Sequence, residues 1–197
     1  MEKKVYELYK TLLERYGPQG WWPADSPYEM AVGAILTQNT NWKNVEKAIA
    51  NLKKANLLTP KAMLEAPLEK IKELIRPSGY YNQKAERLKL MTKAFLEANP
   101  DWDRRKLREH FLRVKGIGKE TADSIVLYAF HKPIFVIDAY TRRFCKHFGL
   151  FEGKDYDEYR EFFERNLPRD VDIFKEYHAL IVRWGKDHPK SRRTSKG

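Results

Sequence analysis

The chain has 197 residues, of which 42% are hydrophobic and 13% aromatic, so it can bury a real core as one or two soluble domains and is not a disordered chain. Its 38 basic residues exceed its 27 acidic residues and leave a net charge of +11, which indicates a polyanionic partner such as nucleic acid, although a basic protein without such a partner stays open. The single cysteine, Cys145, excludes an intramolecular disulfide and a cysteine-rich zinc or iron–sulfur site.

No stretch of the chain approaches the ~18 consecutive apolar residues of a membrane helix. The N-terminal segment MEKKVYELYK is charged and has helical spacing, unlike the apolar core of a signal peptide. We therefore expect a cytoplasmic protein, which is associated with the nucleoid if its partner is DNA.

Hydrophobic residues recur at helical spacing along almost the whole chain. Gly17-Pro18 ends the first helix, and Ser26-Pro27 combines an N-cap with a proline at the first helical position. Glu29 is placed to complete a capping box there. The spacing predicts helices over residues 5–16, 26–36, 42–52, 68–75, 85–95, 107–112, 122–129, 144–148, 159–163 and 174–184, and a short one that starts at Thr59-Pro60.

The only strand-like run is Ile134–Ile137, which is too short to make a sheet by itself. We therefore predict an all-α fold, and the sequence has no internal repeat. Residues 190–197 are polar and basic, and we expect them to fray.

A glycine turn between two predicted helices is the most informative local pattern. Glycines in the turn Gly116-Ile117-Gly118 allow a close approach to a phosphate, where a β-carbon would clash. The first N–H groups of the following helix carry partial positive charge, and Lys115 and Lys119 add full charges beside them. Gly-x-Gly alone is more typical of an ordinary turn between helices, but with the flanking lysines the pattern favours a helix-hairpin-helix that binds the DNA backbone.

A second motif, Val136-Ile137-Asp138-Ala139-Tyr140-Thr141-Arg142-Arg143, follows the hairpin. A glycine hairpin followed by such an apolar-Asp-x-x-Thr-x-Arg segment resembles the endonuclease III-like (HhH-GPD) superfamily of DNA glycosylases. Upstream, Leu36-Thr37-Gln38-Asn39-Thr40 resembles the family's segment that enters the DNA. The resemblance covers residues 26–186, and the paired motifs carry it, since the upstream segment alone is weak.

The resemblance implies two helical domains with the active-site cleft between them. Residues 26–133 would form the central domain with the hairpin, and residues 1–25 plus 134–197 would form the second. Asp138 matches the family's catalytic aspartate, whose carboxylate stabilises the charge that develops on the sugar or orients the attacking water. An aspartate in front of an amphipathic helix is also typical of an N-cap, and the two roles are compatible.

Bifunctional members of the family carry a lysine two residues after the second hairpin glycine, and its amine forms a Schiff base with the sugar. Here that position is Glu120, and Lys119 precedes it. One residue rotates a side chain by about 100° around a helix, so Lys119 is expected to meet phosphate instead. We therefore predict a hydrolytic glycosylase without lyase activity. Glu120 either contacts the base, positions water, or is a solvated carboxylate that the helix dipole favours.

Many relatives end in a four-cysteine iron–sulfur loop after a His-x-x-Leu-Ile-x-x-Gly pattern, which Tyr177–Gly185 resembles. Pro189 stands where the first cysteine would be expected, so the resemblance implies that this chain lacks the cluster. We expect no cofactor and no side-chain metal site. Relatives suggest a monovalent cation at the hairpin backbone carbonyls, a point that this sequence leaves open.

Relatives without the lysine and the cluster include 3-methyladenine DNA glycosylases of the endonuclease III type, which Gly20–Pro23 and Gln38–Trp42 resemble. N3-methylated adenine is cationic and has a weakened glycosidic bond, so its enzyme mainly needs a π-rich pocket that stacks it. Ordinary core packing of the tryptophans and a solvated lysine at a helix end are the alternatives. The expected pocket has two stacking tryptophans, two walls and a nearby lysine: Trp42 and Trp21, Trp22 and Pro23, and Lys186.

The expected partner is double-stranded DNA with a flipped damaged base, bound by a monomer. Gln38 is expected to fill the space that the flipped nucleotide leaves, with a plain surface amide as the alternative. Two rival functions stay open: an endonuclease III-like glycosylase for oxidised pyrimidines or mismatches, and a hairpin protein that binds DNA without catalysis. The expected DNA-binding residues are Gln38, Asn39, Lys115, Gly116, Ile117, Gly118, Lys119, Thr121 and Arg142.

Overall fold

The computed structural model describes residues 1–190, which form helices and connecting loops without a β-strand. The all-α prediction is therefore confirmed. The chain divides into two compact units, one made of Met1–Trp21 and the chain from Phe135 onward, the other of Trp22–Ile134. Sequence reasoning placed these divisions at 25/26 and 133/134. Residues 191–197, which belong to the tail that was expected to fray, lie outside the described part.

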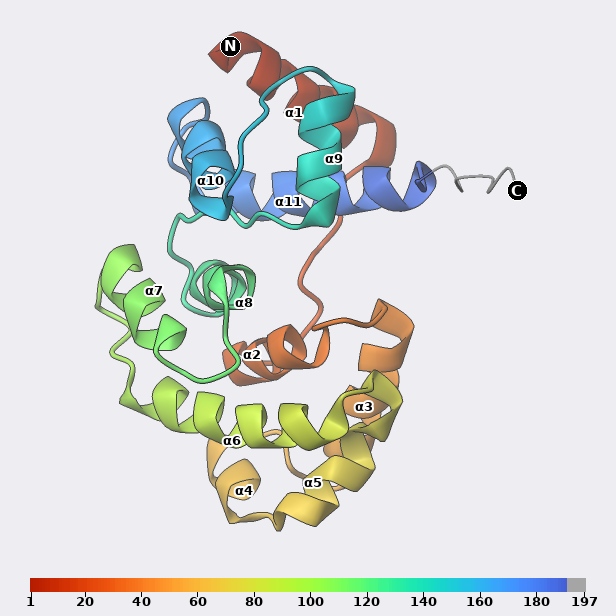
Figure 1. Ribbon diagram of the computed structural model, residues 1–197, viewed down its shortest axis with the longest axis vertical. Helices are drawn as coiled ribbons and strands as arrows, with labels where there is room; N and C mark the ends of the chain where they lie inside the picture. Colours follow the sequence, from red (N-terminus) through yellow and green to blue (C-terminus); the bar gives the residue numbers. More distant parts are fainter. Residues whose placement is uncertain (191–197) are drawn as a thin grey trace. The chain divides into compact units, whose positions relative to one another are not determined.

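The unit Trp22–Ile134, called the hairpin unit below, is built around one buried helix. Every residue of α2 from Tyr28 to Leu36 is buried. Because a helix that is apolar all round must lie inside a fold, α2 packs against α3, α6, α8 and η2, and Figure 1 shows it between α8 and α6. The helices of this unit are α2 (Pro27–Leu36), α3 (Trp42–Lys54), α4 (Pro60–Glu65), α5 (Leu68–Ile75), the 3₁₀ turn η1 (Arg76–Ser78), α6 (Tyr81–Glu97), α7 (Arg104–Leu112), α8 (Lys119–Ser124) and the π-helical turn η2 (Ile125–Ala129).

Side-chain caps start α2 and α4 where the sequence predicts them. Ser26 Oγ accepts a hydrogen bond of 3.0 Å from the N–H of Glu29, and Thr59 Oγ1 accepts one of 3.2 Å from Ala62. Glu29 departs from the predicted capping box. Its carboxylate accepts from the N–H of Asp25 (2.9 Å) and pairs with Lys53 (3.1 Å), so it ties α3 to the start of α2.

The other unit, called the aspartate unit below, joins the two ends of the chain. It contains α1 (Glu2–Tyr16), α9 (Ala139–His147), α10 (Tyr156–Arg165) and α11 (Val171–Asp187), and α11 contacts both α1 and α9. The fully buried Tyr177 of α11 donates its hydroxyl to the backbone oxygen of Val5 at 2.8 Å, which fastens α1 to the C-terminal helices (Figure 1). None of the helices in residues 1–190 has the length and apolar character needed to cross a bilayer.

Several helices start three or four residues before the predicted range, and the start of α9 differs most from the prediction. Hydrophobic spacing placed a helix at 144–148, whereas α9 begins at Ala139. The difference arises because Asp138 and Thr141 form a capping box, which starts the helix one turn before its apolar residues. The preceding run Ile134–Ile137 is buried in an irregular conformation, as expected for a strand-like segment without a partner.

Candidate active site

The predicted helix-hairpin-helix is formed by α7, a tight turn and α8. Gly116 has a φ of +85°, a left-handed conformation that side chains rarely adopt, and Ile117 is buried with 5% exposure, so it anchors the turn. A buried ion pair between Arg108 Nε and Asp123 Oδ1 (2.8 Å) ties α7 to α8. Gly118 is the N-cap of α8, whose first N–H groups have no acceptor within the helix. The turn therefore has the geometry of an anion-binding site.

The exposed residues around the hairpin turn include two lysines and one carboxylate. Lys115 and Lys119 are exposed beside the turn, and Glu120 is exposed in the first turn of α8. Thr121 is instead buried, with 7% exposure, and its hydroxyl accepts a hydrogen bond from another predicted site residue, Gln38. Thr121 is thus placed to hold Gln38 on the hairpin.

Gln38 lies in the loop between α2 and α3 and is bonded through both ends of its amide. Its Nε2 donates to the backbone oxygen of Gly116 (3.0 Å) and to Thr121 Oγ1 (3.1 Å), and its Oε1 accepts from Arg87 (2.9 Å). Asn39 follows it with a positive φ of 52° and an exposed side chain. The structure therefore places Gln38 against the hairpin. This is the residue that we expect to enter the duplex as a wedge, in the space that the flipped nucleotide leaves. Sequence reasoning missed Arg87, because only its position on α6 connects it with either segment.

The capping role of Asp138 is observed directly. Its Oδ1 accepts hydrogen bonds from the N–H (2.8 Å) and the hydroxyl (2.9 Å) of Thr141. Its Oδ2 lies 3.0 Å from Nε2 of His178, which is on α11. The carboxylate is 15% exposed, so it is not sealed in the interior. His178 was noted only as part of the pattern that precedes an iron–sulfur loop, and its contact with Asp138 gives it another role.

The surroundings of Asp138 favour its charged form. Burial by itself would raise the pKa of Asp138, but the hydrogen bond and charge of His178, together with the two hydrogen bonds from Thr141, lower that pKa below its ordinary value. The carboxylate is therefore ionised at neutral pH. A fixed negative charge of this kind can stabilise a positive charge that develops on a sugar.

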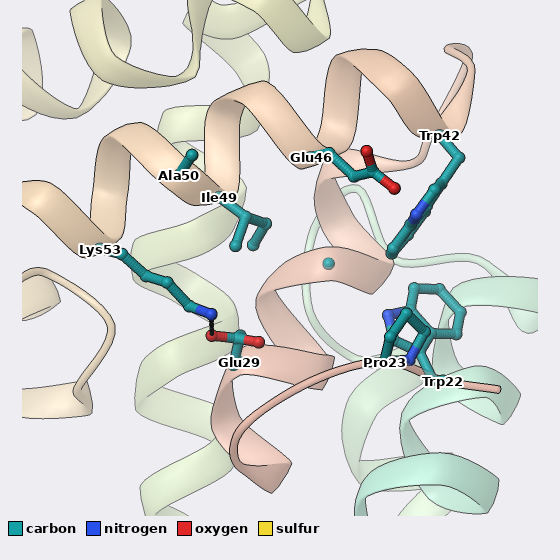
Figure 2. A pocket seen from close by; sticks show the side chains of 9 residues that line it. Trp22, Pro23, Glu29, Trp42, Glu46, Ile49, Ala50 and Lys53 are labelled. Carbon is teal, nitrogen blue, oxygen red and sulfur yellow. Dashed lines mark ion pairs between the residues drawn. The ribbon is translucent and has the colours of Figure 1, made fainter. Parts of the chain in front are cut away.

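A cavity of about 260 Å³ lies in the hairpin unit beside two of the predicted pocket tryptophans. Figure 2 shows Trp22 and Pro23 facing Trp42 at one end, and the two indole rings meet edge to face at 5.3 Å. The close approach of Trp22 depends on Gly33, because a β-carbon there would lie 3.1 Å from its Nε1. The cavity thus has an aromatic wall that could stack a flat ligand.

The lining of this cavity also includes charged residues that sequence reasoning did not assign to it. Glu46 extends from α3 toward Trp42, and farther along α3 the side chain of Lys53 pairs with Glu29 of α2 (Figure 2). The spacing from Trp42 to Glu46, one helical turn, was a signal that could have placed Glu46 beside the indole. Glu29 gave no such signal, since it was assigned to the capping box.

The remaining predicted residues have these positions. Trp21 and Lys186 line a separate hollow in the aspartate unit, together with Gln19 and residues of α11. Arg142 packs over the ring of Tyr159 at 4.8 Å and donates to the backbone oxygen of Lys154 at 3.4 Å. The structure therefore brings Trp22, Pro23 and Trp42 together, and Trp21 with Lys186.

Within residues 1–190 no group of three or more histidine, cysteine, aspartate or glutamate side chains is arranged to hold a metal ion.

Comparison with known proteins identifies the family. A family model described as HhH-GPD superfamily base excision DNA repair protein matches residues 32–169. The chain belongs to this superfamily. It is therefore a DNA glycosylase of HhH-GPD type that acts in base excision repair, and the endonuclease III-like assignment from the sequence is confirmed.

Three relatives illustrate the range of similar glycosylases. A Methanocaldococcus jannaschii protein, provisionally named a DNA repair glycosylase, is 54% identical over 187 residues, covering 90% of this chain and 85% of its own. Endonuclease III of Thermotoga maritima is 28% identical over 171 residues, covering 85% of this chain and 76% of its own. The crystal structure of H. pylori 3-methyladenine DNA glycosylase bound to 1,N6-ethenoadenine matches with a TM-score of 0.82 and 33% identity, covering 94% of this chain and 99% of that one.

Proposed function

We propose that this glycosylase hydrolyses the N-glycosidic bond of cationic alkylated bases, with 3-methyladenine as its main substrate. The observation that carries the proposal is the cavity that joins the Trp22–Trp42 wall to the carboxylate of Glu46. A flat cation gains from the π-electrons of indole rings and from a nearby negative charge, whereas a neutral base gains only the stacking. The similarity to the H. pylori 3-methyladenine glycosylase supports the same substrate class.

In this proposal the hairpin binds the DNA backbone and presents the lesion. The amides that follow Gly116 contact a phosphate, Lys115 and Lys119 add charge, and Gln38 enters the space of the flipped nucleotide. The partner is double-stranded DNA, and we expect a monomer in the cytoplasm or on the nucleoid. Trp21 and Lys186 line a hollow of their own in the aspartate unit, and their contact with the base stays a prediction from the sequence.

The chemical step is hydrolysis. The bond between C1′ and the base breaks, its electron pair leaves with the cationic base, and the base departs neutral. Water then adds its oxygen to C1′ and loses a proton. Asp138 stabilises the positive sugar and orients that water. Glu120 contacts the base or positions water in the same proposal. No cofactor takes part in this step, although a monovalent cation at the hairpin carbonyls remains compatible with it.

The expectation of monofunctional chemistry depends on Glu120. A carboxylate cannot form a Schiff base, and Lys119 is rotated by about 100° from that position on α8. Similarity to endonuclease III of T. maritima makes the oxidised-pyrimidine or mismatch glycosylase the second candidate. The two candidates differ in the base that is released, and a non-catalytic DNA-binding protein would release none.

The decisive experiment is chromatography of the bases released from methylated DNA. We expect free 3-methyladenine, a DNA strand that breaks only after alkali or heat, and no covalent complex after borohydride reduction. Matched duplexes with thymine glycol or a mismatch serve as controls. Release from these duplexes but not from methylated DNA would reject the substrate, and a borohydride-trapped complex would reject the hydrolytic mechanism.

Glu46→Gln tests why the cavity should prefer cations. The substitution keeps the shape of the side chain and removes its charge, so excision of cationic 3-methyladenine should fall roughly fivefold, as expected for one partly screened charge pair. Excision of neutral 1,N6-ethenoadenine should not change. Glu65→Gln, an exposed glutamate of α4 outside the cavity, is the matched control. Equal losses for both bases would contradict selection by charge.

A further inference from the structure

Helix α6 carries two cations that both contact the end of α2 and the residues after it. Lys84 is fully buried, and its ammonium donates to the backbone oxygens of Leu36 (2.8 Å) and Ser78 (2.7 Å). One turn later, Arg87 donates to Oε1 of Gln38 at 2.9 Å. The cations therefore hold the last carbonyl of α2 and, two residues on, the side chain of Gln38.

The side chain of Arg87 also lies against Gly116 of the hairpin turn. A β-carbon added at Gly116 would clash with Nε and Cδ of Arg87, so the glycine leaves room for the arginine stem. The turn residue Gly116 thus lies directly on the side chain that holds Gln38. The backbone oxygen of the same glycine accepts from the Gln38 amide at 3.0 Å.

These contacts use the hydrogen-bonding capacity of the Gln38 amide almost completely. Both Nε2 hydrogens have acceptors, Gly116 O and Thr121 Oγ1, and Oε1 has a charged donor. A charge-assisted hydrogen bond is stronger than a neutral one, so Arg87 is the partner that contributes most to the orientation of the amide. A glutamine without these partners would lose more rotamer freedom when it binds.

We propose that Arg87 is a positioning residue of this glycosylase: it holds Gln38 on the hairpin turn before DNA arrives, so that the wedge and the phosphate-binding amides reach the duplex as one preorganised surface. This inference rests on the proposed role of Gln38 in filling the gap of a flipped nucleotide. It does not depend on which base is excised, because the gap is the same for every lesion.

The test is a double-mutant cycle measured by fluorescence anisotropy. The probes are one duplex with a stable tetrahydrofuran abasic analogue and the same duplex without it. Arg87→Met and Gln38→Ala should each weaken binding to the abasic duplex about 2- to 10-fold, the effect of ordering one long side chain. The double variant should bind no more weakly than Gln38→Ala alone. Binding to the intact duplex should change no more than for Lys93→Met, which removes an exposed charge from the same helix.

Arg87→Lys separates geometry from charge. It keeps the cation but loses the planar guanidinium, so we expect it to bind the abasic duplex as weakly as Arg87→Met. Additive losses in the double variant, full affinity of Arg87→Lys, or an equal loss on the intact duplex would each overturn the proposal. If 3-methyladenine is not released but the cycle is non-additive, only the proposed substrate is wrong.

Discussion

Asp138→Asn should lower the rate of base excision about 10²–10³-fold, the usual cost of removing a preorganised charge from an active site. Asparagine keeps the oxygen that accepts from Thr141, and it is as good an N-cap as aspartate, so α9 should be preserved. The carboxylate charge is lost, and this charge is well defined because His178 and Thr141 lower the pKa of Asp138. Single-turnover release of 3-methyladenine measures the effect, with binding to the abasic duplex as the readout that should not change.

Asp155→Asn is a close control for this substitution. Asp155 caps α10 in the same unit with the same type of capping box, since its Oδ1 accepts from the N–H of Glu158 at 2.9 Å. The two variants make the same chemical change at equivalent helix positions, and the two sites differ in the contact of Asp138 with His178 and in the proposed catalytic role. If Asp138→Asn excises at the rate of Asp155→Asn, Asp138 is a cap and nothing more.

Gly116→Ala should destabilise the hairpin and weaken DNA binding together. A left-handed backbone costs a residue with a β-carbon about 1–2 kcal/mol, and Gly116 has a φ of +85°. The new methyl group would clash with Nε of Arg87 and displace that side chain, and Arg87 would then release Gln38. We expect a free energy of unfolding lower by about 2 kcal/mol and roughly tenfold weaker binding to the abasic duplex.

Gly118→Ala separates backbone strain from the approach of phosphate. Gly118 has an ordinary φ of −91°, and a β-carbon there meets nothing within 4 Å. The variant should therefore unfold like the wild type but bind DNA more weakly, because the methyl group would stand where the phosphate approaches the amides. Wild-type stability of Gly116→Ala would contradict the strain argument. Wild-type DNA affinity of Gly118→Ala would contradict the proposed phosphate site.

Local patterns in the sequence predicted the helices well because each pattern acts over a few residues. The Ser26-Pro27 start of α2, the short helix after Thr59, and the glycine turn before α8 all depend on backbone groups within one helical turn. The exceptions are informative. Glu29 pairs with Lys53, a partner far along the chain, instead of completing the predicted capping box. Hydrophobic spacing placed the start of α9 too late, although the N-cap pattern at Asp138 marks it.

By itself, the sequence determined the all-α class, the hairpin with its lysines, the capping aspartate at 138 and the family. Only the tertiary structure decided which side chains meet: Arg87 with Gln38 and Gly116, His178 with Asp138, and Glu46 beside the Trp22–Trp42 wall. The physical reason is the distance along the chain between the residues that interact. Caps, turns and helical periodicity are set by neighbours within about four residues, whereas these contacts join helices whose relative placement follows from how their buried faces pack. Packing, rather than any local motif, therefore brings together the side chains that hold Gln38, keep Asp138 charged and line the aromatic cavity.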